Sequence, residues 1–538
     1  MDFLDFIKAS PSSYHAVNEI KKLLDDNGFV EINEKRNLNI NYGGKYYITR
    51  NLSSLIAFVI PDKLDNYGFN ITAAHTDSPT FKLKPNFSLD LDRYNMLNTE
   101  VYGGPILNTF FDRPLNIAGR IMVKTNDGIE AKLVSFDKYV CSIPNLCIHF
   151  NRDVNNGVKL NPQVDCLPLL GDGKCDLLEA ISNKLNVKKD NIISHDLFLA
   201  LVDRGMIGGL NDEFIMAPQI DNLECAYALT MGLINGNVKD NTINVMALFD
   251  SEEIGSRTRS GADSKMLEEL LLRISLGLGK NMEEHMIAIN NSFMVSADNA
   301  HAYHPSYPSK YDLTNRVYMN DGIVIKSAAR GSYTTDGYTE GVFKAICDRV
   351  GSKYQMMTNR SDILGGGTLG NISLSHLSIP SVDIGLSQLA MHSAMETCGK
   401  YDLDIMIKAI SEYYSVHLDF IDDKKIEIRW LIMPFVDKNT AIKNLANPKD
   451  FDIFKNRFLK IYKDAVSEIV RLYENNNIDE LYNYISGINN ISLNIGSSVL
   501  YNDTLEVLDK IKRGELAPQI LDDLYQTIRY VYDELKML

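Results

Sequence analysis

Residues 69–79 read Phe-Asn-Ile-Thr-Ala-Ala-His-Thr-Asp-Ser-Pro, a mostly apolar run that ends in a histidine, an aspartate and a proline. The apolar and β-branched residues at its start predict a strand, and Pro79 ends it. Because side chains alternate along a strand, His75 and Asp77 are expected to point to the same side. Such a pair suits a metal site, in which the carboxylate orients the histidine. A solvated strand edge or a satisfied polar pair would give the same short pattern, so other segments must decide.

The composition is that of an ordinary globular protein. The chain has 538 residues, of which 45% are hydrophobic and 23% charged, and this length predicts about two to four domains. A formal net charge of −15 argues against nucleic acid and anionic membranes as partners. The sequence offers neither a membrane span nor a basic leader pattern. Its seven cysteines form no CxxC pair, which argues against a disulfide framework or a thiolate zinc cluster, so we expect a cytoplasmic protein.

Strand and helix patterns alternate through much of the chain. Apolar runs predict strands at 55–60, 69–74, 242–249, 293–297, 323–326, 354–358 and 382–384. Helical patterns occur at 2–24, where residues 10–13 separate two helices, and at 224–234, 266–278, 338–350 and 403–418. Strands that alternate with helices indicate an α/β fold, a mixed sheet with helices on both faces.

Two regions depart from this alternation. Between residues 82 and 140 the runs become short and alternating, as at 115–123 and 130–136 around a turn at 126–128, which predicts antiparallel β structure. Helical patterns return at 176–187 and 196–201. Beyond residue 420 amphipathic helices are predicted at 451–474, 497–513 and 518–538, with no histidine or cysteine after His417.

These patterns divide the chain into three expected parts. An α/β domain is formed by 1–87 and 220–420, and a β-rich insertion occupies 88–219. An all-α C-terminal extension follows at 421–538, and its sequence shows no chemistry beyond helix packing or assembly.

Five separate segments place histidine or carboxylate side chains at expected strand ends. They contain His75 and Asp77, Asp221, Glu252 and Glu253, Asp298, and His392. In open α/β sheets functional groups collect at the carboxyl ends of the strands. Histidine and carboxylate without thiolate suit zinc, or a harder divalent ion, in a catalytic role. Two metal ions could be held only if one carboxylate bridges them. Asp221 is the expected bridge, because it stands alone in its segment while His75 with Asp77 and Glu252 with Glu253 occur as pairs.

Each of these residues also has an ordinary structural interpretation. Asp221 could cap the helix that follows it, and Glu252 with Glu253 could favour a helix start through the helix dipole. Asp298 could be a turn residue, and His392 could be a satisfied polar residue. All of these interpretations would have to hold together for the set to arise by chance.

Five motifs occur in order along the chain. They are His75-Thr76-Asp77-Ser78-Pro79, Asp221-Asn222-Leu223, Asp250-Ser251-Glu252-Glu253-Ile254-Gly255-Ser256, Ser296-Ala297-Asp298-Asn299-Ala300-His301 and Gln388-Leu389-Ala390-Met391-His392-Ser393. Together they resemble the aspartyl aminopeptidase family of di-zinc metallopeptidases. The resemblance extends over about residues 1–420. It implies a catalytic α/β domain with a β-rich insertion that serves oligomerisation, and a large tetrahedral homododecamer.

The resemblance implies two zinc ions in each subunit. One is expected to be held by His75, Asp221 and Asp298. The other is expected to be held by Asp221, Glu253 and His392. Two metal ions that share a water lower its pKa and polarise the scissile carbonyl, which fits this set of residue types.

Three further catalytic roles come from the same resemblance. Asp77 is expected to orient a histidine ligand, and Glu252 to act as the general base that passes a proton to the leaving amine. His149 matches a histidine that reaches the active site of a neighbouring subunit and steadies the tetrahedral intermediate. Without the resemblance, His149 would be interpreted as a core or edge histidine.

The substrate pocket is expected to involve His301, Lys326 and Tyr333. A lysine there suits an acidic N-terminal side chain, although Lys326 could also be a surface lysine at a strand end. The glycine-rich run at 364–370 resembles a family segment and is interpreted as backbone that approaches the peptide.

We therefore expect a zinc aminopeptidase that removes N-terminal Asp or Glu from short peptides. One alternative is the same chemistry on neutral N-terminal residues. Another is a catalytically idle scaffold or cargo protein that acts through its C-terminal helices. Chains of this family usually end near the position where the 421–538 extension begins. The extension is therefore a candidate for binding a protein partner or for changing the assembly.

Overall fold

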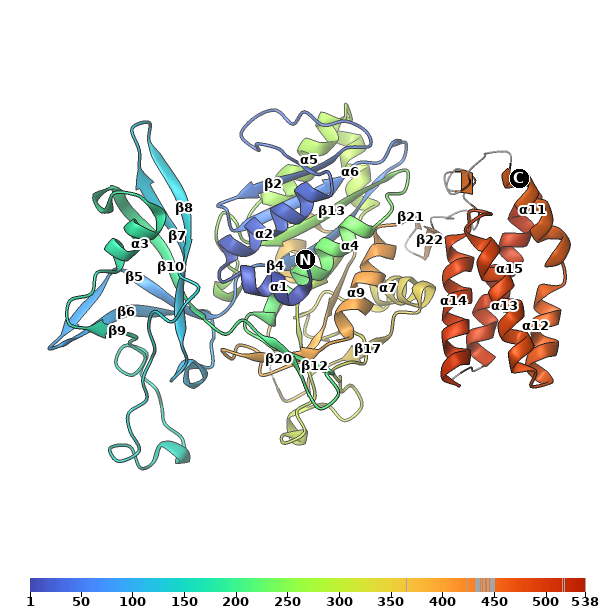
Figure 1. The fold of residues 1–538 in the computed structure, drawn as a ribbon. Coiled ribbons are helices and arrows are strands. Elements are labelled where there is room, and N and C mark those ends of the chain that lie inside the picture. Colours follow the sequence, from blue (N-terminus) through green and yellow to red (C-terminus); the bar gives the residue numbers. More distant parts are fainter. Residues whose placement is uncertain are drawn as a thin grey trace. The chain divides into compact units, whose positions relative to one another are not determined.

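The structure is a computed structural model, and it divides into two compact units, Met1–Trp430 and Leu431–Leu538. The residues that it describes are 1–363, 365–422, 424–430, 436, 438, 441–442, 445, 450–514, 516 and 518–537. Figure 1 shows the elements of both units.

The first unit is built on a nine-stranded mixed sheet. In spatial order its strands are β1 (Val30–Glu31), β2 (Lys45–Arg50), β3 (Ser54–Val59), β13 (Thr242–Phe249), β4 (Gly68–His75), β14 (Phe293–Ala297), β18 (Ser381–Gly385), β16 (Ile323–Lys326) and β17 (Tyr354–Met357). The central strands β13, β4, β14 and β18 run parallel to one another. Their carboxyl ends therefore meet at one edge of the sheet, which is where a site is expected.

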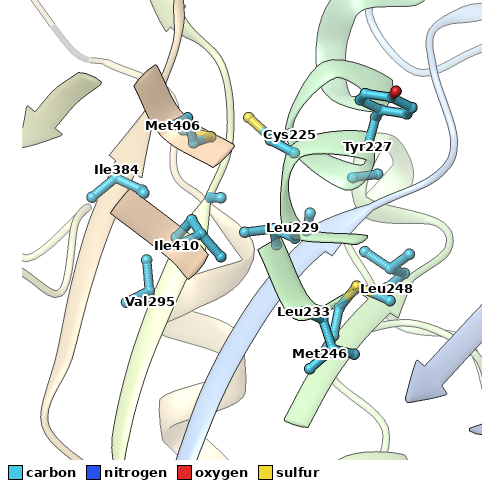
Figure 2. Packing of buried hydrophobic residues seen from close by; sticks show 14 of the residues in the cluster. Cys225, Tyr227, Leu229, Leu233, Met246, Leu248, Val295, Ile384, Met406 and Ile410 are labelled. Carbon is cyan, nitrogen blue, oxygen red and sulfur yellow. The ribbon is translucent and has the colours of Figure 1, made fainter. Parts of the chain in front are cut away.

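Helices cover both faces of this sheet. One face packs against α1 (Phe3–Ala9), α2 (Ser13–Asp26), α4 (Ile220–Asn235), α7 (Gly337–Val350) and α9 (Asp402–Tyr413). The other face packs against α5 (Met266–Gly277), α6 (Met282–Asn290) and α8 (Leu369–Leu377). β13 alternates between the two cores, because Met246 and Leu248 belong to one while Val245 and Ala247 belong to the other. Figure 2 shows α4 packing its apolar side chains between β13 and α9.

A second sheet has six antiparallel strands. In spatial order they are β8 (Ile129–Ser135), β7 (Leu115–Lys124), β10 (Ile192–Leu201), β5 (Thr80–Leu91), β6 (Tyr94–Tyr102) and β9 (Leu169–Asp172). It has its own apolar core, to which α3 (Leu177–Leu185) contributes. This sheet is the predicted β-rich insertion, although β5 begins at Thr80, before the expected boundary at residue 88.

The helical prediction for 196–201 is wrong, because these residues form the end of β10. Leu197, Leu199 and Leu201 alternate into the core of the six-stranded sheet, and β10 pairs with β7 along its length. A short apolar run of this kind fits a buried strand and a buried helix equally well, so pairing with neighbouring strands decides.

A smaller sheet of five strands lies in the same unit. Its order is β11 (Met206–Gly208), β12 (Phe214–Ala217), β20 (Glu396–Gly399), β19 (Ser387–Leu389) and β15 (Ala300–His301). β12 lies at the end of the range expected for the insertion, and it pairs with β20. The insertion therefore contacts the segment that follows His392 in the sequence. Short 3₁₀ turns complete the unit: η1 (Leu107–Phe110), η2 (Val154–Asn156), η3 (Lys189–Asn191), η4 (Glu252–Ile254) and η5 (Pro308–Lys310).

The helix predicted at 403–418 ends earlier than expected. α9 stops at Tyr413, and a hairpin of β21 (Val416–Asp422) and β22 (Lys425–Trp430) follows. The expected boundary at residue 420 therefore lies inside β21. In β22 the apolar residues Ile426, Ile428 and Trp430 alternate with charged ones, which is the period of a strand.

The second unit is helical in the part that the structure describes. Its helices are α11 (Asp450–Ile461), α12 (Ala465–Glu474), α13 (Ile478–Ser492), α14 (Ser498–Arg513) and α15 (Pro518–Met537). They share one apolar core, which includes Phe458, Ile485 and Leu524. The single helix predicted at 451–474 is two helices, α13 was not predicted, and Leu538 lies outside the described residues.

The architecture confirms the predicted fold class: a mixed α/β domain, a β-rich insertion and a helical C-terminal part. Among the described residues, no helix combines the length and apolarity needed to cross a membrane.

Candidate metal centre

The predicted ligands come together at the carboxyl ends of the central parallel strands. His75 is the last residue of β4, and Asp298 directly follows β14. Glu253 lies in η4, four residues after β13 ends. Asp221 lies in the first turn of α4, where it and Asn222 have non-helical backbone angles, and His392 follows β19. The parallel order of the strands thus explains why residues far apart in the sequence share one site.

Asp221 stands between the two histidines. His75 Nε2 lies 3.4 Å from Asp221 Oδ1 and 3.7 Å from Asp298 Oδ1. His392 Nε2 lies 3.5 Å from Asp221 Oδ2 and 3.4 Å from Glu253 Oε1. The two oxygens of Asp221 therefore face different histidines, and each histidine has a second carboxylate beside it.

The electrostatics of this cluster suit a cation. Burial raises the pKa of the Glu253 carboxyl well above its ordinary value, and the charge of Asp221 raises it further. Burial would also raise the pKa of Asp221, but the adjacent imidazoles of His392 and His75 outweigh it and lower that pKa. Asp221 Oδ1 is buried and has no hydrogen-bond partner among the described residues. Ligand atoms of His75, Asp221 and Glu253 lie within 4.8 Å of one another, so the geometry and donor types fit zinc.

Asp77 connects one histidine to the turn that carries the two glutamates. Its carboxylate accepts hydrogen bonds from the backbone N–H groups of Glu252 at 3.1 Å and Glu253 at 3.2 Å. The Tyr102 hydroxyl donates a third, at 2.8 Å. His75 Nδ1 lies 3.0 Å from the Asp77 carbonyl oxygen and 3.5 Å from its Oδ1. Because both are acceptors, Nδ1 carries the proton and the unprotonated Nε2 faces Asp221.

Glu252 lies beside this cluster and is half-buried. Among the described residues its carboxylate has no hydrogen-bond partner. Burial raises the pKa of this carboxyl to about 7, and the charges of Asp298 and Asp77 act in the same direction. A carboxylate with a raised pKa and free oxygens has the properties of a general base.

Sequence reasoning missed Glu396, which is buried in β20. Its Oε2 accepts a hydrogen bond from the Asp221 N–H at 3.0 Å, and its Oε1 accepts one from the His392 N–H at 2.7 Å. It thereby fixes the backbone of two predicted ligands with one side chain. No motif marks Glu396 in the sequence, because its role depends on β20 lying beside the start of α4.

The predicted substrate residues differ in their surroundings. Lys326 is 2% exposed, so its interpretation as a surface lysine is wrong. Its Nζ donates to the Asn299 carbonyl oxygen at 2.8 Å and lies 5.6 Å from the centre of the Tyr333 ring. Burial would lower the pKa of the Lys326 ammonium, but Asp298 and other nearby groups raise it above its ordinary value. His301 is exposed in β15 and lines a cavity of about 350 Å³ with Tyr311 and other residues.

His149 and the glycine-rich run remain apart from these contacts. His149 is exposed in a turn between β8 and β9. Within the part of the chain that the structure describes, its side chain has no hydrogen-bond or ion-pair partner. In the run at 364–370, Leu364 lies outside the described residues, and Gly370 is in the first turn of α8 beside Ser296 and Asp383, close to the end of β14.

Comparison with known families identifies the class of protein. The family model described as Aminopeptidase I zinc metalloprotease (M18) matches residues 6–414. This is more than half of the chain, so the chain belongs to the M18 family. It is a zinc-dependent aminopeptidase, and the predicted family resemblance is confirmed. The match ends before β21, so the whole second unit lies beyond it.

Individual relatives agree with this assignment. The "Probable M18 family aminopeptidase 2" of Clostridium novyi (strain NT) is 46% identical over 425 residues, which cover 77% of this chain and 98% of the relative. A structure described as the Ape4 and Nbr1 complex is 33% identical with a TM-score of 0.75, covering 77% of this chain and 84% of that one. A structure of the S. cerevisiae mApe1 dodecamer is 28% identical with a TM-score of 0.68, covering 77% and 96%.

Proposed function

We propose that this aminopeptidase uses two zinc ions to remove N-terminal Asp or Glu from short peptides. The observation that carries the proposal is the placement of Asp221, whose two oxygens face His75 and His392 respectively. A bridging carboxylate between two histidine-containing sets is what a two-metal site requires.

The residues divide into two overlapping sets around this bridge. His75, Asp221 and Asp298 would hold one zinc ion. Asp221, Glu253 and His392 would hold the other. When bound, zinc polarises the scissile carbonyl and lowers the pKa of a water molecule.

The remaining groups of the site act on protons and orientation. Glu252 takes a proton from the attacking water and delivers it to the leaving amine, because its carboxylate is free and its pKa is raised by burial. Asp77 holds the His75 ring so that its Nε2 points toward the ligand cluster. These roles need no movement of the backbone, since the hydrogen bonds that fix them are already formed.

Lys326 is the group that favours an acidic substrate. Its ammonium has three N–H donors, and the Asn299 carbonyl oxygen accepts a hydrogen bond at 2.8 Å. A carboxylate of the substrate would give this buried cation a charge-assisted partner. A neutral side chain on the substrate would give the Lys326 ammonium no new charged partner. The alternative proposal is a preference for neutral N-terminal residues.

The test is a panel of fluorogenic aminoacyl substrates with purified, zinc-loaded protein. We expect Asp and Glu substrates to be hydrolysed faster than Ala and Leu substrates. The near-isosteric Lys326→Met variant should lose this ratio while it retains hydrolysis of Leu substrates. Faster turnover of neutral substrates by the wild-type protein would support the alternative, and an absence of both zinc and turnover would support an idle scaffold.

We also propose that the chain assembles as a homododecamer through the six-stranded sheet of the insertion. The support is the likeness to the mApe1 dodecamer over 77% of this chain. His149 is exposed and has no partner among the described residues, which suits a residue that completes a neighbouring subunit's site. It would steady the tetrahedral intermediate there. Analytical ultracentrifugation of the full chain tests the assembly.

The second unit is proposed to bind a protein partner. It has its own apolar core, lies outside the family match and contains no histidine or cysteine. The Ape4 relative is described in complex with Nbr1, which is a property of that protein and no more than a precedent for this chain. Comparison of the proteins captured by the full chain and by residues 1–430 tests this proposal.

A reducing, cytoplasmic compartment is our proposal for where the protein works. All seven cysteines are free thiols in the structure, and five of them are buried. Mass spectrometry of protein alkylated directly from cells would detect disulfides that contradict it.

A further inference from the structure

One short segment of the insertion reaches both halves of the ligand cluster. This segment, Tyr102–Ile106, begins at the last residue of β6 and is called the β6 strap here. It belongs to the same subunit as the site, unlike the contribution proposed for His149. None of its residues stood out in the sequence as functional.

The first contact of the strap is with Asp77. The Tyr102 hydroxyl donates to Asp77 Oδ2 at 2.8 Å. The same carboxylate accepts from the backbone of Glu252 and Glu253 and lies beside the His75 ring. Tyr102 therefore helps to hold the group that orients one histidine ligand and the glutamate turn.

The next contact is with the glutamate turn itself. Gly103 has a φ of +72°, and a Cβ at this position would lie 3.0 Å from the Cβ of Glu253. Any other residue would therefore meet both backbone strain and a close contact. The strap packs directly against a predicted ligand at this point.

The last contacts fix His392. The Gly104 carbonyl oxygen lies 3.1 Å from His392 Nδ1, and the Ile106 N–H donates to the His392 carbonyl oxygen at 2.8 Å. Since a carbonyl only accepts, Nδ1 must carry the proton, and the unprotonated Nε2 faces Asp221 and Glu253. The strap thus sets both the position and the tautomer of this histidine.

We infer that the β6 strap is the positioning element for both halves of the metal site, so that the insertion sheet supports zinc binding within its own subunit. The inference rests on the proposed two-zinc site. Residues that orient metal ligands in this way typically contribute about 10–100-fold to metal affinity. The insertion then has a role in catalysis that is separate from assembly.

Two variants and two matched controls test the strap. Tyr102→Phe removes only the hydroxyl, and with it the donor to Asp77, and Tyr94→Phe makes the same change at an exposed position of β6. Gly103→Ala adds a Cβ against Glu253. Gly173→Ala adds one at a φ of +80° with no atom within 4 Å, so it carries the backbone strain alone.

Zinc affinity is measured by competition with a chelator, and the visible spectrum is recorded for the cobalt-substituted full-length protein. We expect Tyr102→Phe and Gly103→Ala to lower zinc affinity by about 10–100-fold and to change the cobalt spectrum. Both controls should match the wild type. The spectrum separates positioning from a loss of stability, because a merely less stable protein would keep the wild-type spectrum in its folded fraction.

The outcomes separate this inference from the proposal on which it rests. A wild-type protein that binds no zinc would overturn the two-zinc site and the strap with it. A wild-type protein that binds zinc, together with strap variants of unchanged affinity and spectrum, would overturn the strap alone. If Gly103→Ala does not fold, Tyr102→Phe decides the matter.

Discussion

The Glu396 carboxylate accepts a hydrogen bond from the backbone N–H of His392 at 2.7 Å, and its second oxygen accepts from Asp221 at 3.0 Å. Both of its oxygens are therefore used as acceptors in a buried position. Burial and the charge of Asp221 raise the pKa of the Glu396 carboxyl, while the two facing N–H donors favour its ionised form. The side chain acts as a clamp between two proposed ligands.

This clamp gives a first prediction. Glu396→Gln replaces one acceptor oxygen with an NH₂ group that faces a backbone N–H. The free energy of unfolding should fall by about 1–3 kcal/mol, the cost of a buried unsatisfied donor, and zinc affinity should fall with it. Chemical denaturation and chelator competition measure the two effects. The control is Glu283→Gln at an exposed position of α6, and equal stability of the two variants would contradict the clamp.

A second prediction separates the general base from its neighbour. Glu252→Gln should retain zinc but lose kcat by about 10²–10⁴-fold, because the base is removed while the proposed ligands remain. Glu253→Gln, one residue later, should lower the zinc content as well. Metal analysis together with steady-state kinetics distinguishes the two variants. Loss of zinc from Glu252→Gln, or substantial turnover by it, would reverse the two assignments.

A third prediction concerns pH. Burial raises the pKa of Glu252 to about 7, and the positive charge of bound zinc would lower it again. Since the base acts only when ionised, kcat/KM should decrease as the pH falls through the resulting pKa, which lies below about 7. A profile that stays flat down to about pH 5 would contradict a carboxylate base with this raised pKa. Zinc content must be measured at each pH, because protonation of the histidines releases metal.

A fourth prediction tests whether His149 acts in a neighbouring subunit. His149→Phe should retain zinc and assembly but lose about 3 kcal/mol of transition-state stabilisation. Mixed oligomers of His149→Phe and Glu252→Gln subunits should recover part of the activity, because some sites then combine an intact Glu252 with a neighbour's intact His149. Verified mixed oligomers without recovery would show that His149 acts in its own subunit or not at all.

A fifth prediction concerns the second unit. A chain of residues 1–430 contains every proposed ligand and the whole family match. It should therefore bind zinc and hydrolyse peptides as the full chain does. Size-exclusion chromatography and the kinetic assay provide the measurements. Loss of assembly or activity would mean that the helical unit supports the enzyme instead of serving a separate partner.

The sequence predicts the central sheet well because its strands are buried on both faces. Thr242–Phe249 is a mostly apolar run with the polar residues Thr242 and Asn244, and β13 has those bounds. The run at 196–201 is too short to separate a strand from a helix, and only pairing with β7 decides it. The hairpin after α9 was missed because its first residues were assigned to the helix predicted at 403–418 and the rest to the all-α extension.

The predicted site shows a similar division. The proposed ligands, such as His75 and His392, could be selected from the sequence because their residue types and the family motifs indicate their chemistry. Glu396 and Tyr102 were not, because they act through hydrogen bonds to residues that the fold alone brings close. No single-sequence pattern marks such a partner.

The placement of the ligands also determines the order of events during synthesis. His75 lies near the start of the chain and His392 close to the end of the first unit. A growing chain therefore exposes His75 long before His392 has been translated. Full metal loading must wait until almost the whole unit has left the ribosome and folded. With the proposed ligand set, we expect zinc to stabilise the finished subunit and not its precursors.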